Sequence, residues 1–154
     1  MIRVCQGALV GTNTALLAAV QRFLWLFCLL GVTGCDGGPS GPTVGLNERF
    51  TLAVGDTASI DTSRIRLEFV EVSGDSRCPA DALCIQGGDA VVRLRAMAGT
   101  AAATLELHTG DASRASDVFQ GLRVELKELQ PYPFSSRTIA KGDYKATFTV
   151  TQQN

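Results

Sequence analysis

Apolar and polar residues alternate along most of the chain after Phe50. Segments 50–54, 92–96, 122–126 and 144–150 each place apolar side chains at every second position. Because successive side chains of a strand point to opposite faces of a sheet, this period predicts half-buried strands around one core. Short stretches containing Gly, Asp or Pro separate the segments. The sequence therefore predicts an all-β domain, a single antiparallel β-sandwich or small barrel of about 6–8 strands.

One of the expected strands changes phase in its middle. The apolar residues from Ile65 to Phe69 alternate with polar ones, whereas Val70 and Val72 follow in the opposite phase. An extra residue in one strand of an antiparallel pair produces such a change, so we expect a β-bulge near Phe69. Segment 110–119 shows no comparable alternation, and we expect one helical turn there.

The chain begins with a long apolar region. The ten residues FLWLFCLLGV, at 23–32, carry no charge and follow Gln21 and Arg22. A bilayer of roughly 30 Å needs about 20 helical residues, so this run is too short to span one and instead fits the apolar part of a secretory signal. We expect export, with an uncleaved N-terminal anchor or a core helix as alternatives. A weaker apolar run at 7–20 makes the signal unusually long, which favours a translation start at Val20.

The sequence VTGC, which ends at Cys35, resembles the lipobox of bacterial lipoproteins. That motif has an aliphatic residue, a small or β-branched one, Gly or Ala, and an obligatory Cys; Val32 stands where Leu is commoner. The resemblance implies that a signal peptide of residues 1–34 is removed and that Cys35 is lipid-modified. Because each buried acyl CH₂ contributes about 0.8 kcal/mol, two or three chains on one cysteine anchor a protein without a transmembrane helix. The Gly- and Pro-rich start of segment 35–47 predicts a flexible tether.

Two cysteines remain in the part that we expect to be exported. Cys5 and Cys28 lie in the expected signal and Cys35 is the expected lipid site, which leaves Cys78 and Cys84. An even pair in an exported domain is most simply a disulfide, and the intervening residues suffice to bring the two Cα atoms within roughly 4.4–6.8 Å. Closing so short a loop stabilises by about 2 kcal/mol, so its main effect is on the shape of the loop. A redox pair is the alternative, although the spacing is not C-x-x-C.

Residues with catalytic or metal-binding chemistry are sparse. The single histidine, His108, falls beside Glu106 on the outward side of its expected strand, where we expect it to be exposed. One imidazole and one thiol pair do not complete a zinc or copper site. Asp75, Asp81 and Asp89 lie around the cysteine loop without the spacing of a paired acid and base, so we expect solvated turn residues, with an enzyme that uses these carboxylates as an alternative. The sequence predicts no catalytic residue, no metal and no cofactor.

Two stretches of the expected domain resemble a family of small bacterial lipoproteins of uncharacterised function. Segment 75–95, DSRCPADALCIQGGDAVVRLR, is similar to the family pattern DSRCP-x4-C-x2-G followed by an acidic residue and Ala. Gln86 and Gly87 stand where that family usually has Trp and Ala. Segment 126–150 is similar to its C-terminal half: a strand, a Pro-Tyr-Pro turn, and a closing strand entered through Asp-Tyr. The resemblance implies an exported, tethered β domain and brings no catalytic residues.

Two surface loops are candidate binding elements, because loops held on a rigid β scaffold commonly carry binding sites. The first is the cysteine loop, whose candidate residues are Arg77, Asp81, Leu83, Ile85 and Gln86. The second is an aromatic patch of Tyr132 and Phe134, which flanking prolines hold in place. The alternative for this patch is that the prolines end a strand and Tyr132 covers the core.

These observations predict three regions: a signal peptide at 1–34, the lipidated cysteine with its tether at 35–47, and a β domain at 48–154. The net charge of -1, without a basic face, argues against nucleic acid as a partner. We expect a lipoprotein of the bacterial cell membrane, facing the periplasm or the exterior, whose partners are the membrane through the anchor and a protein or envelope component. The domain is expected to bind without catalysis. The alternative is an inhibitor of an envelope-acting hydrolase that presents the Cys78–Cys84 loop.

Overall fold

The computed structural model describes residues 41–61 and 63–153, which belong to one compact unit, Gly38–Asn154. The expected signal peptide, the lipobox and Cys35 lie outside the described residues. The described chain is all-β, with nine strands in two sheets and one short 3-10 helix, η1 (Lys141–Asp143), so the predicted sandwich class is confirmed. In this part of the chain no helix is long and apolar enough to span a membrane.

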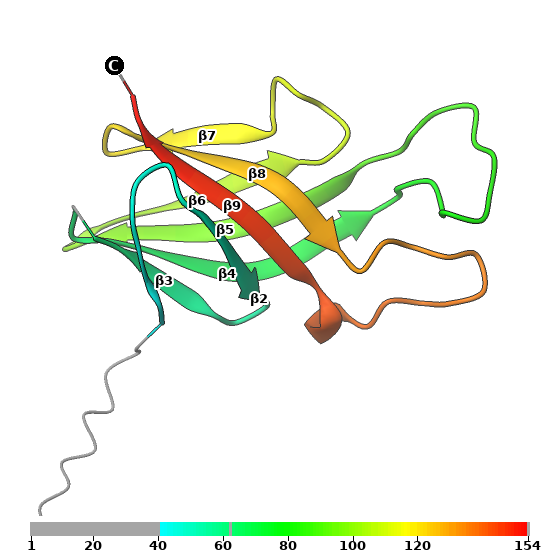
Figure 1. Cartoon of the computed structure of the whole chain (residues 1–154), viewed down its shortest axis with the longest axis horizontal. Helices are drawn as coiled ribbons and strands as arrows, with labels where there is room; N and C mark the ends of the chain where they lie inside the picture. Colours follow the sequence, from blue (N-terminus) through cyan, green and yellow to red (C-terminus); the bar gives the residue numbers. More distant parts are fainter. Residues whose placement is uncertain (1–40, 62, 154) are drawn as a thin grey trace, which may run out of the picture. The chain divides into compact units, whose positions relative to one another are not determined.

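The first sheet has five strands, and neighbours in the sheet are mostly consecutive in the chain (Figure 1). In spatial order the strands are β1 (Thr43–Val44), β3 (Thr57–Ile60), β4 (Ile65–Asp75), β5 (Ala90–Ala98) and β6 (Ala101–His108). The pairs from β3 to β6 are antiparallel, whereas β1 runs parallel to β3. Short antiparallel connections of this kind are what the closely spaced turn residues of the sequence predict.

The second sheet has four antiparallel strands. In spatial order they are β2 (Arg49–Ala53), β9 (Lys145–Gln152), β8 (Leu122–Gln130) and β7 (Ser116–Phe119). The chain therefore crosses from one sheet to the other three times: between β1 and β2, between β2 and β3, and between β6 and β7. The total of nine exceeds the expected 6–8 because the sequence pattern did not reveal the short strands β1 and β7.

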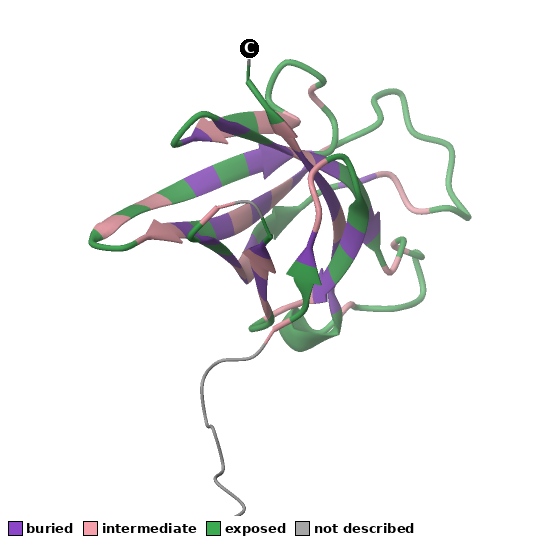
Figure 2. Ribbon diagram, turned by 60° about the vertical axis from the view of Figure 1, so that its left-hand side comes forward, coloured by how far each residue is buried: buried purple, intermediate pink, exposed green. Residues whose placement is uncertain are grey.

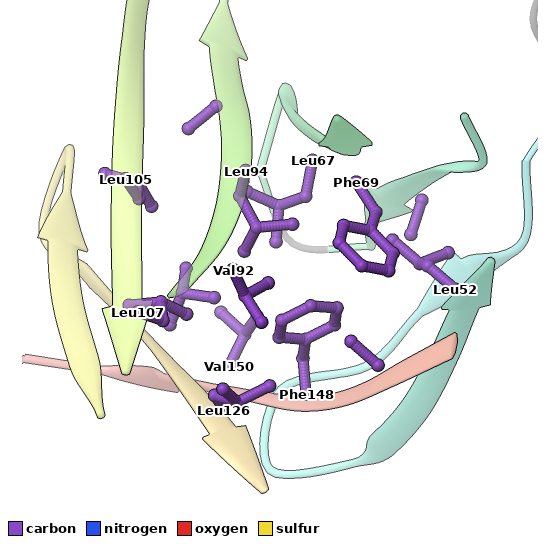
Figure 3. Close-up of a cluster of buried hydrophobic side chains, with 14 of the residues drawn as sticks. Leu52, Leu67, Phe69, Val92, Leu94, Leu105, Leu107, Leu126, Phe148 and Val150 are labelled. Carbon is purple, nitrogen blue, oxygen red and sulfur yellow. The ribbon is translucent and has the colours of Figure 1, made fainter. Parts of the chain in front are cut away.

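The core lies between the two sheets and follows the alternation of the sequence. Buried and exposed residues alternate along the strands (Figure 2). Phe148 lies near the centre, with its ring centroid 6.1 Å from that of Phe69 and 5.9 Å from that of Phe50. Leucine and valine side chains from both sheets surround this aromatic cluster (Figure 3). Because Phe148 is fully buried and contacts both sheets, it ties the two layers together.

The phase change in β4 is a bulge, as predicted. Phe69 pairs with Leu94 and Glu71 pairs with Arg93, so the register shifts by one residue between them. The shift returns Val72 to the core side of the sheet, where it is buried.

The expected helical turn in segment 110–119 is wrong. Its second half is β7, which pairs with β8 and forms one edge of the second sheet. The four-residue strand is too short to show a clear alternation, so its pairing with β8 decides its conformation.

Part of the expected tether is folded. Ser59 N–H donates to Pro42 O at 2.9 Å and Asp61 N–H donates to Val44 O at 2.9 Å, which fixes β1 at the edge of the first sheet. The Val44 side chain is buried in the core. The β domain therefore begins a few residues before the predicted boundary at 48, and β1 covers an edge of β3 that would otherwise be free.

Three loops gather at one end of the sandwich. They connect β4 to β5 (76–89), β6 to β7 (109–115) and β8 to β9 (131–144), and the C-terminus lies at the opposite end (Figure 1). The first and third of these loops are the two candidate binding elements of the sequence analysis, and both project away from the sheets (Figure 2).

Candidate functional site

The predicted disulfide between Cys78 and Cys84 is present. The two Cα atoms lie 6.0 Å apart, within the range that the bond requires. Inside the loop, Ala82 N–H donates to Pro79 O at 3.1 Å, and at its base Cys78 N–H donates to Gly87 O at 3.0 Å. The covalent bond and the turn together hold the cysteine loop, 76–89, in one shape.

The cysteine loop is also bonded to the 131–144 loop. Ala80 N–H donates to Pro133 O at 2.9 Å. The Asp81 carboxylate accepts hydrogen bonds from the Ser135 backbone N–H at 2.8 Å and from its hydroxyl at 2.5 Å. These two bonds lower the pKa of Asp81 below its ordinary value. Asp81, a predicted binding residue, therefore joins the two loops.

The Arg77 side chain connects both loops to the ends of β4 and β8. Its Nε and Nη2 donate to the two carboxylate oxygens of Asp75 at 2.9 and 2.6 Å. Nη1 donates to Leu129 O at 2.6 Å, and Nη2 also donates to Pro131 O at 2.9 Å. The Arg77 side chain is only 6% exposed. The expectation that Arg77 presents itself to a partner is therefore corrected, because the side chain is buried and four of its five N–H groups donate to groups that hold the loops.

The Asp75 carboxylate is the counter-ion of this anchor. It accepts a further hydrogen bond from the Tyr144 hydroxyl at 3.1 Å. Burial raises the pKa of Asp75, but the hydrogen bonds and charge of Arg77 outweigh it and lower the pKa overall. Burial and the neighbouring carboxylate raise the pKa of Tyr144. Asp75 is therefore a structural carboxylate rather than the solvated turn residue that the sequence suggested.

Four large apolar side chains are exposed on the described surface, and all four lie on the two joined loops. Leu83 and Ile85 on the cysteine loop are fully exposed, at 104% and 105%, while Tyr132 and Phe134 on the other loop are each 46% exposed. We refer to Leu83, Ile85, Tyr132 and Phe134 as the tip patch. The guanidinium of Arg77 lies 5.3 Å from the centroid of the Tyr132 ring and supports it from one side. Hydrogen bonds thus join the two loops that carry the candidate binding elements, which the sequence proposed separately.

His108 is buried, and the expectation that it is exposed is wrong. It does lie on the outward side of β6, but only 5% of the residue is exposed. The Asp89 carboxylate lies 2.5 Å from Nδ1, and the His108 backbone N–H donates to Arg114 O, in the loop after β6, at 3.0 Å. Burial raises the pKa of Asp89, but the hydrogen bonds from Gly110 and His108 lower it overall. Loops that are far apart in sequence therefore bury a residue whose strand position is outward.

A groove of about 750 Å³ lies beside His108 and extends to Tyr132 of the tip patch. It is lined chiefly by Arg77, the end of the cysteine loop (86–88), the end of β6 with its following turn (108–110), residues 126–130 of β8, and Tyr132. Gln86, the last of the predicted binding residues, is exposed and lines this groove. The volume is within the range of small-molecule sites.

The carboxylates of the described site serve to hold its loops. Asp75, Asp81 and Asp89 are each used in hydrogen bonds that hold the loops. Asp89 and His108 have the arrangement of a base and its orienting carboxylate, but among the described residues no hydroxyl or thiol bonds Nε2, which a nucleophile would need to do. Within the same residues, no group of three His, Cys, Asp or Glu side chains is placed to hold a metal ion.

The chain matches no protein family, no curated protein and no solved structure. The residues and their geometry therefore carry the functional argument alone.

Sequence reasoning missed the pairing of Ser135 with Asp81, the pairing of His108 with Asp89, and the groove. Ser135 and Asp81 are separated by 54 positions, and no local pattern announces such a contact. A signal for the second pair was present. His108 is the last residue of β6, Asp89 directly precedes β5, and these two strands pair with each other. The alternation alone could not show that the end of β6 lies beside the start of β5.

Proposed function

We propose that this protein is an exported lipoprotein whose β domain binds a protein partner, without catalysis, through the tip patch. One observation carries the proposal: Leu83 and Ile85 are fully exposed on a loop whose shape is already fixed. Exposed apolar clusters on an ordered loop mark interaction surfaces, and full burial of one such side chain contributes about 1.5–3 kcal/mol.

The two loops are already held in a fixed conformation, which supports a binding role. Association costs free energy whenever flexible side chains and loops must be fixed. Here the disulfide, the Asp81–Ser135 bonds and the Arg77 anchor fix the loop backbones before any partner arrives. The apolar side chains can therefore bind at a small entropic cost, which is the arrangement of a recognition surface rather than of a mobile connection.

The shape of the cysteine loop favours a concave partner. A projecting, disulfide-closed loop with apolar side chains fits a cleft better than a flat surface. This observation also favours the second candidate function, inhibition of an envelope-acting hydrolase, in which Leu83 and its neighbours would occupy the cleft of the enzyme. Loss of inhibition after deletion of residues 80–83 would be its signature.

Export and anchoring rest on the N-terminal sequence and on the cysteines. The VTGC motif ending at Cys35, the apolar run before it and the polar tether after it support lipidation. A disulfide in the folded domain supports an oxidising compartment outside the cytoplasm. Mass spectrometry of the protein extracted from its own membrane in mild detergent tests this: we expect a chain that begins at Cys35 and carries two or three acyl chains. An unmodified Cys35 would contradict the anchor.

A site-specific crosslinking experiment tests the tip patch. A photoreactive amino acid replaces Phe134 in the full chain, and cells of the native host are irradiated. We expect one discrete crosslinked protein, and we expect the adduct to disappear when Leu83→Ser and Ile85→Ser are added. The matched control, Ala102→Ser with Thr104→Ser, changes exposed residues of β6 and should leave the adduct unchanged. An adduct that survives the loop substitutions, or no adduct at all, would contradict the proposal.

A further inference from the structure

β6 is the longest of the four strands that lie at a sheet edge. It has eight residues, whereas β1 has two, β2 has five and β7 has four. Because an open edge pairs readily with another chain, proteins commonly keep edge strands short or place a bulge, a proline or a lysine in them. β6 contains no proline and no lysine, and it pairs with β5 without a register shift. It is therefore the unprotected edge of the described sandwich.

The backbone groups of every second residue of β6 point away from β5. The His108 N–H shows this direction, because it donates to Arg114 O in the following loop and not to β5. Peptide groups alternate in direction along an antiparallel strand, so the N–H and C=O groups of Ala102, Thr104 and Glu106 also point outward. No described residue bonds them, since β6 pairs with β5 alone and β7 bonds to β8. A further strand can therefore add to this edge.

The open edge carries almost no charge. Residues 101–105, AAATL, carry none. Glu106 is already paired within its own sheet, because Arg93 Nε lies 2.8 Å from its Oε1. Like charges that face each other across two strands destabilise their pairing. An antiparallel copy of β6 meets no such opposition along residues 101–105, so this edge is compatible with itself.

The inner face of the same segment is incompletely covered. Ala101 and Ala103 point to the core side of the sheet, yet both are only partly buried, whereas Leu105 and Leu107 farther along β6 are buried. The β5–β6 hairpin that contains these alanines lies at the end of the sandwich opposite to the three loops (Figure 1). A copy related by a twofold axis perpendicular to the sheet places its own second sheet on the side of these alanines. Pairing therefore offers them apolar surface to pack against.

We propose that two copies of this chain pair through β6 in an antiparallel arrangement, with the twofold axis at Ala103, and form one continuous ten-stranded sheet. Ala102 of each copy then faces Thr104 of the other, and each facing pair exchanges two backbone hydrogen bonds. Pairing centred on Ala103 uses residues 101–105 and avoids the end of β6, where the His108 N–H is occupied. Both copies contribute the same surface, so the assembly closes at two.

The interface is small and separate from the tip patch, which lies at the other end of the sandwich. About four backbone hydrogen bonds and a few small side chains place it at the low end of specific interfaces. We therefore expect a dissociation constant of about 0.1 mM in solution. Two copies that share one membrane surface meet at a higher effective concentration, which favours the pair further.

Sedimentation equilibrium of the compact unit 38–154 tests the proposal, because this unit contains the whole described core. The concentrations run from about tenfold below to about tenfold above the expected dissociation constant, without reductant. Thr104→Pro removes an outward N–H that β5 does not use, as edge strands tolerate, and should weaken the dimer at least about tenfold. The matched control is Thr51→Pro on β2. Its N–H also points to a free edge, because Val54 N–H, three residues on, donates to Tyr144 O next to β9. Circular dichroism checks that both variants are folded.

A cysteine at the twofold axis tests the register. Ala103 faces its own copy in a pair without hydrogen bonds, where the two Cα atoms lie about 4.5 Å apart, so Ala103→Cys should form a disulfide-linked dimer under mild oxidation. Ala101→Cys faces Leu105 of the other copy and should remain largely unlinked. Mass spectrometry of the linked peptides identifies the bond and separates it from exchange with Cys78 or Cys84.

Three outcomes would overturn the proposal. The first is a monomer over the whole concentration range, which would leave the edge to a segment of another protein or to water. The second is equal weakening by Thr104→Pro and Thr51→Pro, and the third is equal linking of the two cysteine variants. Leu83→Ser with Ile85→Ser should leave the dimer intact, so failure here is distinguishable from failure of the tip patch. A dimer that these two changes abolish would assign self-association to the tip patch and also contradict pairing through β6.

Discussion

Replacement of Arg77 by methionine removes the anchor of both loops while keeping most of the apolar stem. The change leaves the Asp75 carboxylate without its counter-ion and leaves the carbonyls of Leu129 and Pro131 without their donors. Loss of one partner from a buried ion pair costs about 3–5 kcal/mol. Asp75 keeps the Tyr144 hydrogen bond and its side chain is 11% exposed, so we expect the lower end of this range, about 3 kcal/mol.

Urea unfolding followed by circular dichroism measures this loss. With a slope of about 1.5 kcal/mol per molar urea, the midpoint should fall by about 2 M. The matched control is Arg66→Met on β4, where the arginine is exposed, and its effect should stay within about 0.5 kcal/mol. Both variants are measured without reductant, so that the disulfide stays closed.

A double-mutant cycle with Asp75→Asn decides whether the ion pair is the cause. The two single changes share one interaction, so the double variant should be more stable than the sum of the single losses predicts, by about 1 kcal/mol or more. A loss of less than about 1 kcal/mol in Arg77→Met would refute the reasoning. Strict additivity would do the same, because it would show that the guanidinium and the carboxylate do not depend on each other.

Three further predictions concern other parts of the domain. The pKa of Asp75 is held below its ordinary 3.8 although burial raises it, so its stabilisation is present above that pH and is lost as the pH falls further; Asp75→Asn should make the acid unfolding curve less steep, and an unchanged curve would contradict this. A Cβ on Gly110 would lie 2.4 Å from Gly88 O, whereas one on Gly74 meets nothing within 4 Å; Gly110→Ala should therefore cost about 1–3 kcal/mol in urea unfolding and Gly74→Ala almost nothing, and equal losses would count against the close approach. The buried hydroxyl of Thr149 has no partner in the described structure, so Thr149→Val should leave the thermal midpoint unchanged or raise it, and a clear fall would show that the hydroxyl is paired.

The parts of the fold that depend on local alternation were predictable. The phase change after Phe69 identified the bulge, because a residue inserted into a half-buried strand must move later side chains to the other face. β1 was not predictable, since two residues carry no period. Its formation depends on pairing with β3, which the sequence does not encode locally.

The candidate site was predictable in its parts and not in its assembly. The cysteines indicated a closed loop and the prolines indicated a second ordered loop, and both are present. That Arg77 faces inward depends on carbonyls more than 50 positions away. The burial of His108 likewise depends on the loop that follows β6. Contacts of this kind join segments that are distant in sequence, so periodicity and spacing contain no information about them.

Under the proposed function, the residues that bind a partner differ from those that keep the domain folded. Leu83 and Ile85 are fully exposed, and the shape of their loop is held by the disulfide and by backbone and Asp81 bonds. Substitutions at these two positions can therefore alter recognition while leaving the free energy of unfolding almost unchanged. If the tip patch is the recognition surface, selection for a new partner and selection for stability act on different residues, and one sandwich of this kind can diversify its partners by a few changes at the tip.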